Sequence, residues 1–172
     1  MISFENKKTG TLVYRTTPTD EEFIYTGKPL LVETDQDGII TYANRRFVEI
    51  SGYTKEELIG SPHCVHFHPH MPESIFKDAC RVTSEGKIWS GYVRNVSKHG
   101  VSYWTEMIAQ PKFDDQGAII GFMATRKAPQ KEAIHAVMEE YAMLYKQSGS
   151  QARSQFCGEV YVGGGRPMCA VS

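Results

Sequence analysis

The sequence has no excess of positive charge and no long apolar run. Its 19 lysines and arginines are balanced by 20 acidic residues, for a formal net charge of −1. Without a basic field the chain is not expected to bind the phosphate backbone of a nucleic acid. No stretch has the apolar length that crosses a bilayer, and the first residues lack the apolar region of a secretory signal. We therefore expect a cytoplasmic protein that does not insert into membranes.

Motifs for catalysis and for covalent cofactor attachment are also missing. The four cysteines include no CxxC pair and no CxxCH sequence that would attach haem covalently. The chain shows no nucleophile with its base and no glycine loop that would hold a phosphate. These absences argue against an enzyme.

Two periodicities alternate along the chain. Strand-like segments, with polar and apolar residues alternating or with β-rich runs, occupy residues 29–34, 39–43, 88–96, 102–113 and 118–126. Helical spacing occurs in short pieces over 44–58 and in one longer segment over 72–82. This order predicts an α+β fold with a five-stranded antiparallel sheet and short helices on one face.

The ends of the chain differ from this central region. We expect an N-terminal cap over 1–27 and a sensory domain over 28–128. An amphipathic C-terminal helix is expected over 129–147, because apolar residues recur there at helical spacing. A flexible tail is expected over 148–172, which is rich in glycine and serine.

Four motifs carry a resemblance to a known family. The motif GxIxYxNxxFxxxSGY at 38–53 resembles the PAS domain. More narrowly, PHCVHFHPHMP at 62–72, WSGYVRN at 89–95 and GVSYW at 100–104 are similar to the PAS domain at the N-terminus of bacterial aerotaxis receptors. The resemblance implies the PAS fold.

The same resemblance implies FAD, held non-covalently between the helices and one face of the sheet. It implies contacts from seven residues: Asn44, His63, Phe67, His68, Trp89, Asn95 and Tyr103. Trp89 would wall the flavin ring and Asn95 would bind its polar edge. This chain departs from the family at two positions, because Phe67 and His70 stand where relatives carry arginine and aspartate.

The histidines of segment 62–72 leave other interpretations open. PAS domains also bind haem b, for which a neutral histidine is a good axial ligand, although the helix expected over 72–82 contains none. His66 and His70 lie outside the family motif and are expected to be solvated imidazoles on a surface loop. A protein-interaction module without a cofactor is the third alternative.

The family resemblance also implies how a signal would leave the domain. A change in the redox state of the flavin, or in oxygen, would alter hydrogen bonds around Asn95. The sheet would pass this change to the N-terminal cap or to the C-terminal helix. We expect a homodimer through one of these two elements, and a signalling partner such as a chemotaxis or kinase component.

Overall fold

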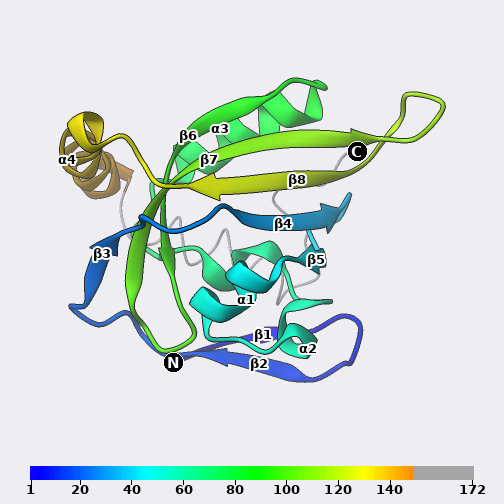
Figure 1. The fold of residues 1–172 in the computed structure, drawn as a ribbon, viewed down its shortest axis with the longest axis horizontal. Coiled ribbons are helices and arrows are strands. Elements are labelled where there is room, and N and C mark those ends of the chain that lie inside the picture. Colours follow the sequence, from blue (N-terminus) through cyan, green and yellow to red (C-terminus); the bar gives the residue numbers. More distant parts are fainter. Residues whose placement is uncertain (149–172) are drawn as a thin grey trace.

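A computed structural model describes residues 1–148 of the chain. Figure 1 shows a twisted sheet with helices packed against it and a separate hairpin near the N-terminus. The tail predicted over 148–172 lies outside the described residues, apart from Ser148 at the end of the last helix.

Over residues 30–148 the elements follow the predicted order, and three further strands precede them. The strands are β1 (Ile2–Glu5), β2 (Leu12–Arg15), β3 (Glu22–Ile24), β4 (Leu30–Asp35), β5 (Ile40–Ala43), β6 (Trp89–Val96), β7 (Ser102–Phe113) and β8 (Ile119–Lys127). The helices are α1 (Arg45–Ser51), α2 (Lys55–Leu58), the 3₁₀ helix η1 (His63–His66), α3 (Glu73–Ser84) and α4 (Lys131–Ser148). The main sheet has the order β3-β7-β8-β4-β5, and β6 also pairs with β7. The predicted α+β class is confirmed.

The main sheet has six strands, so the predicted five-stranded antiparallel sheet is wrong in this detail. Strand β3 pairs parallel with β7, with Phe23 opposite Tyr103. The reason is the length of β7: its pairing with β8 ends at Glu106 and Lys127, which leaves the edge at 102–104 uncovered. Strand β3 provides hydrogen-bond partners for this edge, which would otherwise remain open.

The tight turn between β4 and β5 confirms the predicted hairpin. The Asp35 side chain accepts hydrogen bonds from the backbone N–H groups of Asp37 and Ile39, at 2.9 and 3.0 Å. Gly38 adopts φ 75°, which a residue with a side chain rarely does. The DG turn of the sequence therefore fixes the register of the two strands.

The N-terminal hairpin β1–β2 is tied to α2 by one buried amide. Asn6 is fully buried, and its Nδ2 donates to the carbonyl oxygens of Glu56, Glu57 and Ile59 at 3.0–3.2 Å. Because the last carbonyls of a helix lack partners within the helix, the Asn6 amide caps α2 from a distant segment. Figure 1 shows the hairpin and α3 on opposite sides of the molecule.

The main sheet has two faces with different coverings. We call inner the face that carries Met107 and Ala124, against which α1, η1 and α3 pack, and outer the face that carries Trp104. Helix α4 lies against the outer face, where the Tyr141 ring is 5.8 Å from that of Trp104. The Tyr141 hydroxyl donates to the Tyr92 carbonyl at 2.7 Å. Within residues 1–148, no helix has the length and apolar content needed to span a membrane.

Candidate cofactor site

An apolar cavity lies between α3 and the inner face of the sheet. Its walls include Val32, Phe76, Ala79, Met107, Phe122 and Ala124, and His63 and Phe67 border it from the loop before α3. Cavities with apolar walls and a few polar groups are where proteins hold small molecules and cofactors. The structure therefore places the candidate site where the family resemblance puts FAD.

Two stacked aromatic rings narrow this cavity. Phe67 from the loop and Phe76 from α3 lie 4.2 Å apart with an interplanar angle of 13°. The free volume is about 40 Å³, whereas pockets for drug-sized ligands measure about 300–1,000 Å³. A flavin ring therefore fits only if side chains at the cavity, such as the stacked Phe67 and Phe76, move aside.

A cluster of polar side chains is buried on the inner face, and His63 links it to the cavity. Arg126 on β8 is fully buried, and its Nε donates to Asn95 Oδ1 at 3.1 Å. Arg126 Nη2 lies 3.4 Å from Nε2 of His63, which borders the cavity. Asn95 in turn donates to the Tyr103 carbonyl and to Thr105 Oγ1, at 3.1 and 3.0 Å. The cavity therefore has a polar end held in place by a hydrogen-bond network.

Several atoms of this polar end have no hydrogen-bond partner among the described residues. They are Arg126 Nη1, the Tyr103 hydroxyl and both ring nitrogens of His66. Most buried polar atoms in native proteins are hydrogen-bonded, because an unpaired one costs about 1–3 kcal/mol. Arg126 and His66 both lie next to His63, which borders the cavity, so their unpaired atoms are groups that a polar ligand could satisfy.

The expectation that His66 is a solvated surface residue is wrong. Its side chain is fully buried, with ring centroids 4.8 Å from His63 and 4.9 Å from Phe47. In a 3₁₀ helix residues i and i+3 lie above one another, which brings His63 and His66 together on η1. His70 is exposed as expected, although its ring lies 4.5 Å from that of Tyr145 on α4.

Burial sets the protonation states at the polar end. Desolvation, followed by the charge of Arg126, lowers the pKa of His63 and of His66 well below the usual range. Both imidazoles are therefore neutral at pH 7, each with one donor and one acceptor nitrogen. Burial lowers the pKa of Arg126 to about 10, so its guanidinium is still charged at pH 7.

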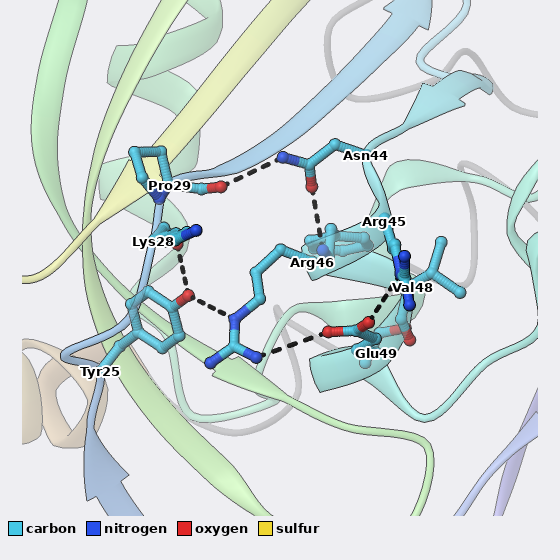
Figure 2. Close-up of polar contacts among 10 residues, drawn as sticks. Tyr25, Lys28, Pro29, Asn44, Arg45, Arg46, Val48 and Glu49 are labelled. Atoms are coloured by element: carbon cyan, nitrogen blue, oxygen red, sulfur yellow. Dashed lines mark hydrogen bonds and ion pairs between the residues drawn. The ribbon is translucent and has the colours of Figure 1, made fainter.

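Asn44 has a structural role. Its Oδ1 accepts from the Phe47 N–H at 2.9 Å as the N-cap of α1, and its Nδ2 donates to the Pro29 carbonyl at 3.1 Å. Figure 2 shows this amide joining Pro29, just before β4, to α1, beside a second link in which Arg46 donates to the Tyr25 hydroxyl. Both ends of the Asn44 amide are thus used away from the cavity.

His68 and Trp89, two further residues that the resemblance implies as flavin contacts, have their main contacts outside the cavity. His68 is buried near Arg94 and His70, and Phe67 rather than His68 borders the cavity. Trp89 donates from Nε1 to Asp78 on α3 at 3.1 Å, which joins β6 to α3. In this conformation neither side chain lines the cavity.

The loop that carries His63 and Phe67 is anchored by a buried arginine of the N-terminal hairpin. Arg15 Nη1 donates to the carbonyl oxygens of Cys64, Val65 and Phe67, at 3.3, 2.9 and 3.0 Å. One guanidinium group therefore holds the backbone on both sides of His66. The hairpin β1–β2 is thus connected directly to the loop at the cavity.

Comparison with known proteins identifies the fold. A family model described as PAS fold matches residues 40–126. The chain belongs to the PAS fold family. It is 41% identical over 115 residues to the aerotaxis receptor of Escherichia coli, which covers 67% of this chain and 22% of that receptor. It is 29% identical over 129 residues to the biofilm dispersion protein BdlA of Pseudomonas aeruginosa, covering 73% and 30%. This PAS chain thus spans less than a third of either relative.

Solved structures share the same architecture. A light-oxygen-voltage domain studied with a flavin analogue superposes with a TM-score of 0.58 at 17% identity, covering 66% of this chain and 86% of that one. A PAS domain from Colwellia psychrerythraea gives a TM-score of 0.55 at 25% identity, covering 60% and 87%. The PAS fold inferred from the sequence motifs is confirmed.

Two residues at the polar end were not expected from the sequence. Arg126 shares a strand face with the apolar residues Phe122 and Ala124, and that alternation is readable in the segment 118–126. A lone arginine on an apolar strand face is the signal that would have indicated it. For His66 the sequence offers only the i, i+3 spacing from His63.

Proposed function

We propose that this PAS domain binds FAD in the inner cavity and reports redox state or oxygen to a signalling partner in the cytoplasm. The observation that carries the proposal is an apolar cavity bordered by His63, which is linked to the buried pair Arg126 and Asn95. The likeness to an aerotaxis receptor and to a light-oxygen-voltage domain studied with a flavin analogue supports it. A sensor, and not an enzyme, is the function class we infer.

The residues at the cavity suit a flavin chemically. Met107 and Ala124 offer an apolar surface for the ring, and Arg126 and Asn95 are linked to the cavity through His63, where they would bind the ring's polar edge. Bound FAD would supply reversible electron transfer. The protein's part is to orient the ring, exclude water and place hydrogen bonds at its edge. Of the seven residues expected from the resemblance, we retain His63, Phe67, Asn95 and Tyr103 for this site.

Asn95 is well placed to transmit a change at the polar end. Its amide bonds the Tyr103 carbonyl, the Thr105 hydroxyl and Arg126 at once. Arg94 precedes Asn95 in the chain, and Trp104 follows Tyr103. Arg94 and Trp104 lie opposite each other on the outer face of the sheet. A rotation of the Asn95 amide would therefore shift β6 against β7 and move the outer pair.

The outer pair contacts both candidate output elements. Glu22 on β3 accepts from Trp104 Nε1 at 2.9 Å and forms an ion pair with Arg94. Tyr141 on α4 packs against the same Trp104 ring. We propose that a change in the domain over 28–128 reaches the N-terminal cap over 1–27 and the helix over 129–147 through these contacts with Arg94 and Trp104. A homodimer through either element would pass that state to a chemotaxis or kinase partner.

Haem b is the second candidate, and one observation favours it. His66 is a buried neutral imidazole with no partner for either nitrogen among the described residues, which is the state that ligates iron. Helix α3 contributes no histidine to the cavity. A Soret band in the purified protein would identify haem, and the absence of any chromophore would favour the interaction module without a cofactor.

Blocking the cavity tests where FAD binds. Ala79 on α3 borders the inner cavity, so Ala79→Phe fills it and should reduce FAD binding at least about tenfold, measured by quenching of flavin fluorescence. Ala142→Phe is the matched control, because Ala142 borders a separate cavity between α4 and the outer face. Equal FAD affinity in the wild type and in Ala79→Phe would contradict binding in the inner cavity.

A further inference from the structure

The side chain of His66 has no structural partner that explains its burial. It is fully buried, and within residues 1–148 neither ring nitrogen has a hydrogen-bond partner. Its ring meets Phe47 and Phe67 edge to face, at 4.9 and 5.1 Å, contacts that an apolar side chain would make equally well. Two buried, unpaired nitrogens therefore destabilise the protein unless something else binds them.

The neighbours of His66 indicate the chemistry of the group that would bind its ring nitrogens. His63 lies 4.8 Å away, ring to ring, and borders the cavity. Next to His63 is Arg126, which forms no ion pair with any carboxylate in the described part of the chain and whose Nη1 has no partner. A buried cation without an anion favours a ligand group that is negative or rich in hydrogen-bond acceptors.

We propose that His66, together with His63 and Arg126, recognises the hydrogen-bonding edge of the ring of the cavity's ligand. This inference rests on the proposed function, in which that ligand is a flavin. A flavin ring edge offers carbonyl oxygens for Arg126 and a mixture of donors and acceptors for a neutral imidazole. A phosphate is a poor fit here, because one cation and two neutral rings would leave its second charge uncompensated in a buried site.

The proposal makes opposite predictions for binding and for stability. His66→Leu removes the unpaired nitrogens but keeps an apolar side chain of similar size. The denaturation midpoint of the ligand-free protein should therefore stay the same or rise. Flavin affinity should fall about tenfold, the loss expected for one hydrogen bond to a ligand. A residue that only supported the fold would lower stability and affinity together.

Three flavins separate recognition of the ring edge from recognition of phosphate. Fluorescence titrations with riboflavin, FMN and FAD should show the same fold-loss for His66→Leu, because all three carry the same ring. His66→Gln keeps one donor and one acceptor and should retain affinity within about threefold of the wild type. His135→Leu, at an exposed histidine of α4, is the control and should change nothing.

Four results would overturn the proposal. They are unchanged flavin affinity in His66→Leu, a loss confined to FMN and FAD, a loss in His66→Gln as large as in His66→Leu, and a fall in denaturation midpoint that accompanies the loss of affinity. If the wild type binds none of the three flavins, the proposed function itself fails. That outcome is recognised from the wild-type titration alone.

Discussion

Burial of imidazoles determines how single residues respond to pH. Burial is the main cause that lowers the pKa of His66 far below its usual range and that of His68 to about 2. In the unfolded chain these groups bind protons near pH 6.5. Below that pH the unfolded state therefore holds more protons than the folded state, and stability falls as the pH falls.

We predict that the free energy of unfolding, measured by urea titration, is lower at pH 5 than at pH 7. In His66→Leu this fall should be smaller by on the order of 1–2 kcal/mol, because one buried imidazole no longer titrates in the unfolded state. His135→Leu, at an exposed position, should show the wild-type difference. The same pH dependence in the wild type and in His66→Leu would contradict the burial of His66 as a neutral ring.

The case of His66 shows what the sequence leaves open at this scale. Four histidines between two prolines are typical of a solvated polar loop, and nothing in the composition separates buried from exposed members. The 3₁₀ geometry of η1 places His63 and His66 together and turns both inward, while His70 stays exposed. A short 3₁₀ turn leaves no periodic signal, so this burial was not predictable.

At the scale of elements, the N-terminal hairpin supports the loop at the cavity. Arg15 is buried, and Arg15→Met removes the donor to three loop carbonyls. We predict a loss of about 2 kcal/mol in the free energy of unfolding and faster amide hydrogen exchange across residues 63–68.

The matched control for this prediction is Arg45→Met. The Arg45 side chain is 94% exposed, and among residues 1–148 its ion pair is with Glu49 on the surface of α1. Such a pair contributes at most about 1 kcal/mol and often nothing measurable. If Arg15→Met and Arg45→Met destabilise the protein equally, the hairpin does not anchor the loop.

Elements with a local signal were predictable from the sequence, and those that depend on distant pairing were not. The DG turn at Asp37 and Gly38 and the helical stripe of α4 both appear as expected. Strand β3 did not, because three residues are too few to show a periodicity and their partner on β7 is about eighty positions away. The strand count of the sheet was wrong for this reason.

At the scale of the whole molecule, the sheet separates a candidate site from candidate outputs. The cavity and the polar end lie on the inner face, and Trp104 meets β3 and α4 on the outer face. The family resemblance implies a flavin between the helices and the sheet, and the structure has its inner cavity between α3 and the sheet. The resemblance names residues without their contacts, so only the structure shows that His63 borders the cavity while the Asn44 amide bonds Phe47 and Pro29.

The central claim is that this PAS domain binds a redox-active flavin. The most direct test is the visible absorption spectrum of the purified protein after incubation with FAD and removal of free cofactor by gel filtration. We predict that the two bands of oxidised flavin elute with the protein, bleach on chemical reduction and return in air. A protein that stays colourless after this treatment, or one that shows a Soret band instead, would contradict the account.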